Sequence, residues 1–79
     1  MTQVSDLNLQ EYTRHIVKKY LYNLKGHPAK NLNKLIIDEA QIGLILEVLS
    51  FTKGNLTETS EILGITRTTL RNKIRKHKL

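Results

Sequence analysis

The chain of 79 residues has no cysteine and no tryptophan, and it contains only one proline and four glycines. Without cysteine, neither a disulfide bond nor a thiolate metal site can stabilise the fold. Its three histidines, His15, His27 and His77, do not have the spacing of metal ligands, so we expect no metal and no cofactor. A single domain of this size buries only a modest core, and oligomerisation is the obvious way to bury more surface.

Long hydrophobic runs are also absent. No apolar stretch approaches the roughly 20 residues that a membrane span requires, and the first residues show no secretory signal. We therefore expect a cytoplasmic protein without membrane contact. The serines and threonines have no histidine and aspartate partners at a meaningful spacing, and no glycine-rich phosphate loop occurs. We expect no enzymatic activity.

Acidic residues are missing from the C-terminal end, where the basic residues gather. Residues 1–64 contain seven Lys or Arg and seven Asp or Glu, whereas residues 65–79 contain six Lys or Arg and no acid. The formal net charge of +6 therefore lies entirely in the last fifteen residues. A compact cationic segment indicates a polyanionic partner, and nucleic acid is the first candidate.

Two long helices are predicted in the first two thirds of the chain. Apolar residues at spacings of three and four predict a helix over about residues 9–24, ended by Gly26 and Pro28. A second helix is predicted from residue 31 or 32 to Phe51.

The second predicted helix is apolar on nearly every side. Ten of the fifteen residues from 35 to 49 are apolar, and such a helix must be buried in most directions. So small a monomer has too few other elements to cover it, so we expect a homodimer. A strand over residues 44–49 is the alternative, but the length and the flanking acidic residues favour a helix.

The last third of the chain has the pattern of a helix-turn-helix. Asn55 is expected to cap a third helix over residues 56–63, with Glu58 reaching back in a capping box. Gly64 is expected to end that helix in the left-handed conformation, and Thr66 to cap a last helix from Arg67 to about residue 77. A short helix, a glycine turn and a capped second helix in this order are typical of the motif.

Apolar and small residues are expected to fix the crossing of these two helices. Ser60 is small enough for the close contact. The predicted core of the motif consists of Ile62, Leu63, Ile65, Leu70 and Ile74.

The last helix is basic over most of its outer surface. Arg67, Arg71, Arg75 and Lys78 follow one another at spacings of four, four and three. A helix of this kind can enter a DNA major groove with phosphates on both sides. The alternative is a solvated face whose last cations interact with the helix dipole. The preceding short helix and glycine turn favour DNA binding.

Three segments of this region resemble the Fis (factor for inversion stimulation) family. They are residues 52–57, 62–67 and 69–74, and residues 17–21 and 35–49 resemble the two longer helices of the same family. The resemblance covers about residues 9–79. It implies an all-α, four-helix fold in which two longer N-terminal helices form an intertwined dimer core, followed by the C-terminal helix-turn-helix. The implied division is a short flexible N-terminus (1–8), dimerisation helices (9–52) and a helix-turn-helix unit (53–79).

The resemblance implies a homodimeric, sequence-tolerant DNA-binding and DNA-bending protein, a nucleoid-associated transcriptional regulator. Its partner would be double-stranded DNA with an A/T-rich centre, which is recognised through its deformability. Arg67 would contact a base edge. The residues that would position the DNA backbone are Asn55, Thr57, Thr69, Arg71 and Lys73, assisted by Arg75 and Lys76.

The sequence departs from the family pattern at three places. Thr66 replaces an asparagine that is common before the arginine, and Asn72 stands where a basic residue is common; both positions remain in the predicted DNA-binding set. Only about eight residues precede the first helix, so contact with a recombinase through a longer N-terminal arm is not expected. Two other functions remain as alternatives: a protein-binding module for an acidic partner, and an RNA-binding chaperone.

Overall fold

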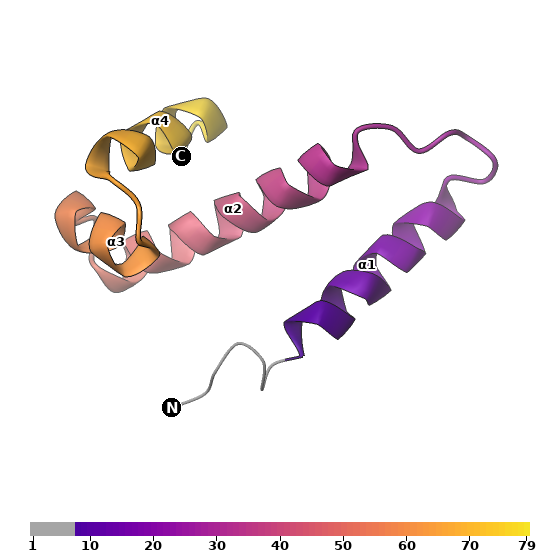
Figure 1. The fold of residues 1–79 in the computed structure, drawn as a ribbon, viewed down its shortest axis with the longest axis horizontal. Helices are drawn as coiled ribbons and strands as arrows, with labels where there is room; N and C mark the ends of the chain where they lie inside the picture. Colours follow the sequence, from indigo (N-terminus) through magenta and orange to yellow (C-terminus); the bar gives the residue numbers. More distant parts are fainter. Residues whose placement is uncertain (1–7) are drawn as a thin grey trace. The chain divides into compact units, whose positions relative to one another are not determined.

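The computed structural model describes residues 8–79. These residues form four α-helices, which are α1 (Leu9–Asn23), α2 (Leu32–Phe51), α3 (Leu56–Leu63) and α4 (Arg67–His77) (Figure 1). No strand occurs among the described residues. The all-α prediction is confirmed, and the helix boundaries agree with the predicted ones to within about one residue. The predicted flexible N-terminus, apart from Asn8, lies outside the described residues.

The chain divides into two compact units, Met1–Asn31 and Leu32–Leu79. The first unit contains α1 and the second contains α2, α3 and α4. The predicted grouping of residues 9–52 as dimerisation helices concerns a second chain, and it stays a prediction.

Helix α1 has an amphipathic pattern without a core of its own. None of its residues is buried. Its exposed large apolar side chains are Leu9, Tyr12, Ile16, Leu21 and Tyr22. A helix of fifteen residues is marginal in water unless its apolar face packs against something else. The exposed apolar side chains of α1 therefore form a surface that needs a packing partner.

Helix α2 is apolar on several sides, but α3 and α4 leave most of these sides exposed. Ile45 is its one buried residue, at 2% exposure. Its exposed large apolar residues are Leu35, Ile37, Leu44, Leu46 and Phe51. A large exposed apolar surface on a soluble protein marks an interaction site. The exposed sides of α2 thus agree with the expectation that a further chain covers them.

Helix α2 ends in a hydrogen-bonded turn that contains a strained lysine. The Gly54 N–H donates to the Leu49 carbonyl at 2.9 Å, which is the bond of a Schellman motif. Lys53, just before it, has φ 56°, and Gly54 has φ 84°. The left-handed conformation costs an L-residue roughly 1–2 kcal/mol, whereas glycine adopts it freely.

Lys53→Gly is therefore expected to stabilise the protein by about 0.5–1 kcal/mol, after allowance for the greater chain entropy of glycine. Urea unfolding at a fixed chain concentration measures this change in the free energy of unfolding. Lys53→Ala is the matched control, because it removes the same charge but keeps the strained Cβ. Equal stability of the two variants would contradict the account of this turn.

A pair of buried hydroxyl groups joins the end of α2 to α3. Thr52 Oγ1 and Thr59 Oγ1 are 2.7 Å apart, and Thr59 is fully buried. Thr52 Oγ1 also lies 3.3 Å from the Asn55 carbonyl oxygen and 3.4 Å from that of Leu49. Carbonyl oxygens only accept hydrogen bonds, so the Thr52 hydroxyl donates its proton to one of these two carbonyls. The Thr59 hydroxyl then donates its proton to Thr52 Oγ1.

The two helices of the helix-turn-helix begin and end as predicted. Asn55 Oδ1 accepts a hydrogen bond from the Glu58 N–H at 3.0 Å, and Gly64 has φ 74°. The capping box is only half formed, which corrects the expectation for Glu58. The Asn55 N–H donates to the Thr52 carbonyl at 3.2 Å, so it does not need the Glu58 side chain.

The core of the helix-turn-helix is small. Leu70 and Thr59 are fully buried and Ser60 is 5% exposed, as expected for a close helix crossing. Leu63, Ile65 and Ile74 are half-buried around them. Ile62 is 53% exposed, and its predicted place in this core is wrong. The inward side of α3 is defined by Thr59 and Ser60, and Ile62 lies off that side.

Candidate nucleic-acid interface

Helix α4 has a buried side and a cationic side. Leu70 fixes the helix to the rest of its unit, and Lys73, Ile74 and His77 are half-buried on the same side. The exposed cations of the helix are Arg67, Arg71, Arg75 and Lys76. Packing therefore orients Arg67, Arg71 and Arg75, here called the arginine stripe, away from the core of the unit. A ligand can reach them on this outer side.

The start of α4 is held by two threonines. Thr66 Oγ1 accepts a hydrogen bond from the Thr69 N–H at 3.1 Å, and the Thr66 hydroxyl donates to Thr69 Oγ1 at 2.9 Å. Thr66 thus acts as the N-cap of α4. Arg67 follows the cap directly and is exposed, so its guanidinium group projects from the first turn of the helix.

The predicted contacts on α3 lie at its first turn. Asn55 and Thr57 are both exposed. The Asn55 side-chain oxygen is used in the cap of α3, so the amide nitrogen is the part available to a ligand. The structure thus places the predicted set at two helix starts and along the outer side of α4. Thr69 and Lys73 are the exceptions, because both are half-buried. Lys73 also lines a cavity of about 120 Å³ with Gln41, Leu63 and Ile65 among others.

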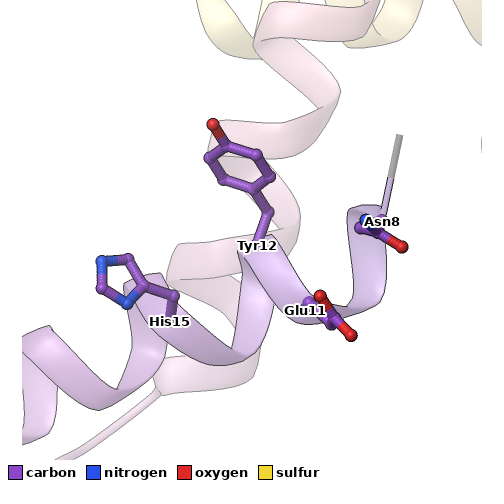
Figure 2. Close-up of a pocket in the computed structure, with 4 residues that line it drawn as sticks. All are labelled: Asn8, Glu11, Tyr12 and His15. Carbon is purple, nitrogen blue, oxygen red and sulfur yellow. The ribbon is translucent and has the colours of Figure 1, made fainter. Parts of the chain in front are cut away.

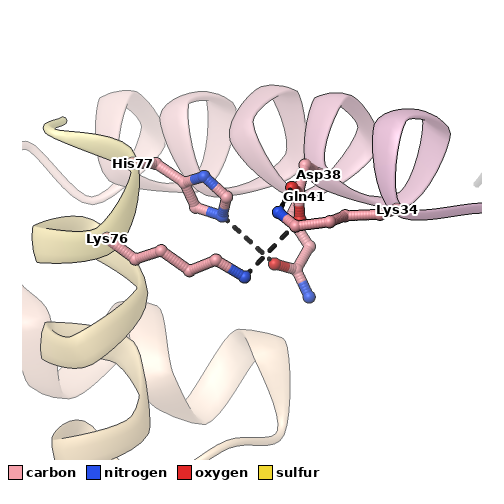
Figure 3. A network of polar contacts seen from close by, with 5 residues as sticks. All are labelled: Lys34, Asp38, Gln41, Lys76 and His77. Carbon is pink, nitrogen blue, oxygen red and sulfur yellow. Dashed lines mark hydrogen bonds and ion pairs between the residues drawn. The ribbon is translucent and has the colours of Figure 1, made fainter. Parts of the chain in front are cut away.

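A polar network connects the last turn of α4 with α2 (Figure 3). Lys76 Nζ lies 3.6 Å from Asp38 Oδ1, and Lys34 Nζ lies 2.7 Å from Asp38 Oδ2. His77 Nε2 lies 3.3 Å from Gln41 Oε1. The ammonium of Lys34 is the main cause that lowers the pKa of the Asp38 carboxyl below its usual value. Asp38 is therefore ionised in neutral solution and interacts with two cations.

Few features of the sequence indicate this network. The spacing of four between Lys34 and Asp38 was the only local signal. The link from Asp38 to Lys76 joins residues 38 positions apart, which no helical periodicity reveals.

The other concave surfaces offer little chemistry. An open depression on α1 is lined by Asn8, Glu11, Tyr12 and His15, whose side chains project separately and are not joined by hydrogen bonds (Figure 2). Among the described residues, no group of three or more His, Cys, Asp or Glu could hold a metal ion. No helix in that part of the chain is long and apolar enough to cross a membrane.

Comparison with known proteins supports the interpretation of these helices. Residues 37–77, which include most of α2 and all of α3 and α4, match the model of the family described as bacterial regulatory protein, Fis family. The matched segment is more than half of the chain. This chain belongs to the Fis family.

Full-length relatives extend the Fis-family match to α1. DNA-binding protein Fis of Buchnera aphidicola is 35% identical, with 99% of this chain and 84% of the relative covered. DNA-binding protein Fis of Glaesserella parasuis is 36% identical and that of Proteus mirabilis 32%, each with 95% of this chain and 76% of the relative covered. The resemblance identified from the sequence is thereby confirmed.

Proposed function

We propose that this Fis-family chain is a homodimeric regulator that binds and bends double-stranded DNA. The observation that carries the proposal is the arginine stripe on the outer side of α4, placed directly after a helix-turn-helix turn. The relatives are themselves named DNA-binding proteins. A DNA partner of this kind places the chain in the cytoplasm, on the nucleoid.

Arg67 is the proposed base-contacting residue. It is exposed in the first turn of α4, and the first residues of a recognition helix are the ones that reach base edges. The bidentate guanidinium group suits the O6 and N7 atoms of guanine. The other proposed contacts, which position the DNA backbone, are Asn55, Thr57, Thr69, Arg71, Asn72, Lys73 and Arg75.

Thr66 has a different role within the proposed interface. Its hydroxyl oxygen is the N-cap of α4, and its proton is donated to Thr69. We therefore assign to Thr66 the placement of Arg67 and Thr69, which follow it on the helix. The Thr69 hydroxyl accepts this bond, and its own proton can be donated to a phosphate oxygen.

The apolar surface left exposed on α1 and α2 supports a homodimer. A second copy of the chain would cover side chains that one chain leaves in solvent. A two-fold dimer presents two copies of α4, one to each half of a site. Where the two helices are closer than one helical repeat, the DNA must bend, and A/T-rich sequence at the centre makes this deformation easier.

Titration of a duplex of roughly 30 base pairs, about three helical turns, at several salt concentrations tests DNA binding. Each phosphate contact adds about 0.9 to the slope of log affinity against log salt, so a dimer with several contacts per chain gives a steep slope. Single-stranded RNA and an acidic peptide are the comparison ligands. A slope near zero on the duplex, or tighter binding to either comparison ligand, would contradict the proposal.

Sedimentation at micromolar concentration tests the homodimer without DNA. We expect a single species with twice the mass of the chain, because only two apolar side chains among residues 8–79, Ile45 and Leu70, are buried fully or nearly so. If only monomer is observed across this concentration range, the homodimer proposal is wrong. DNA binding by a single chain would then still have to be tested.

A further inference from the structure

We infer that Lys76 is a tether between α4 and α2 and not a phosphate contact, and that Asp38 is the positioning residue that holds it. The inference rests on the proposed function, because it concerns which cations of α4 are available to DNA. It divides the exposed cations of the helix into two groups. The arginines on the outer side face the ligand, and Lys76 fixes the end of the helix.

The side chains of Lys76 and His77 both point toward α2. Lys76 and His77, consecutive in the last turn of α4, both make their polar contacts with α2, to Asp38 and Gln41 (Figure 3). Two neighbouring contacts to the same helix fix the position of that turn. Among the described residues, no ion pair is made by any of the arginines Arg67, Arg71 and Arg75. Lys76 is thus distinguished from them by a partner within the protein.

Asp38 differs from the neighbouring acid, Glu39, in its contacts. The Asp38 side chain is 24% exposed and its two oxygens face different cations, Lys76 and Lys34. Glu39, the next residue, is exposed and makes no ion pair among residues 8–79. A general acidity of α2 therefore does not explain the position of Lys76. The contact depends on Asp38, whose carboxylate faces Lys34 on α2 and Lys76 on α4.

The ion pair between Lys76 and Asp38 is expected to contribute little to the stability of the fold. The Lys76 side chain is 57% exposed, and exposed ion pairs contribute little to stability. Loss of Asp38 should therefore leave the protein folded while it releases the Lys76 ammonium from α2. A released lysine on the last turn of a DNA-bound helix becomes available to a phosphate. The tether consequently limits the number of ionic contacts that each chain makes.

Asp38→Asn and Glu39→Gln form the matched pair of variants, since each removes one negative charge from adjacent positions of α2. The measurement is the salt dependence of affinity for the same mixed-sequence duplex. We expect the slope for Asp38→Asn to be steeper than that for Glu39→Gln by about 0.9 per chain, or about 1.8 for a dimer. Lys76→Ala in the otherwise native chain should leave the slope nearly unchanged.

Two double variants identify the lysine responsible, because Asp38→Asn also releases Lys34. The steeper slope should persist in D38N/K34A and disappear in D38N/K76A. Equal slopes for D38N and E39Q, a gain that survives K76A, or a lower slope for K76A alone would each overturn the inference.

The free protein provides a test that does not depend on DNA. In urea unfolding, the effects of D38N and K76A should be non-additive, whereas those of E39Q and K76A should add. Additive effects of D38N and K76A would overturn the tether even if the duplex is bound. A native chain that binds no duplex but shows the non-additivity would contradict the proposed function and leave the tether standing.

Discussion

Arg67→Ala is expected to weaken binding to a preferred duplex by roughly 1–3 kcal/mol for each chain that contacts the DNA, and to reduce discrimination among sequences. Arg67 is exposed in the first turn of α4, directly after the Thr66 cap, so its removal takes away a base contact and no packing. The free energy of unfolding should not fall, because a cation at a helix N-terminus opposes the helix dipole. Affinities for a set of duplexes with single base changes measure the effect.

Arg75→Ala is the matched control for this prediction. Arg75 is the same residue type, is also exposed, and lies in the last turn of the same helix. Its loss should weaken binding to all sequences alike and reduce the salt slope by about 0.9 per chain. If both variants lowered all affinities by the same factor, Arg67 would be a backbone contact and its proposed role would be wrong.

Thr52→Val is expected to destabilise the protein by about 1–3 kcal/mol per chain, because it leaves a buried donor without an acceptor. The Thr59 hydroxyl is fully buried, and Thr52 Oγ1 at 2.7 Å is its partner. Valine has nearly the shape of threonine, so packing changes little. Urea unfolding at a fixed chain concentration measures the loss.

The matched variants of this pair have unequal expected effects. Thr59→Val should cost less than Thr52→Val, because the Thr52 hydroxyl still donates to the carbonyl of Leu49 or Asn55. The double variant should also cost less than Thr52→Val alone, since replacement of both partners by apolar groups leaves nothing unsatisfied. A Thr59→Val variant less stable than Thr52→Val would reverse the donor and acceptor assigned here.

The four helices could be predicted from the sequence because their signals are local. Asn55, Gly64 and Thr66 act within a few residues of themselves, and the structure shows each in its predicted role. The same is true of the stripe Arg67, Arg71 and Arg75, since helical periodicity alone puts it on one side. Membership of the Fis family followed from these local features and their order.

Features that depend on contacts between helices were predicted less well. Ile62 is apolar and lies next to the turn, yet the packing of Thr59 and Ser60 places it outside the core. The contact of Lys76 with Asp38 depends on how α4 lies against α2, and the composition of either helix alone does not reveal it. The exposure of large apolar residues on α1 and on α2 likewise depends on packing that neither helix sequence reveals alone.

The main proposal is that two copies of α4 contact DNA together. Hydroxyl-radical footprinting of the full chain on a duplex with a preferred site is its most direct test. We expect two protected segments whose centres lie about one helical turn, roughly 10 base pairs, apart, at two chains per duplex. In the Arg67→Ala variant the same footprint should form with lower affinity. A single protected segment at one chain per duplex would contradict the account.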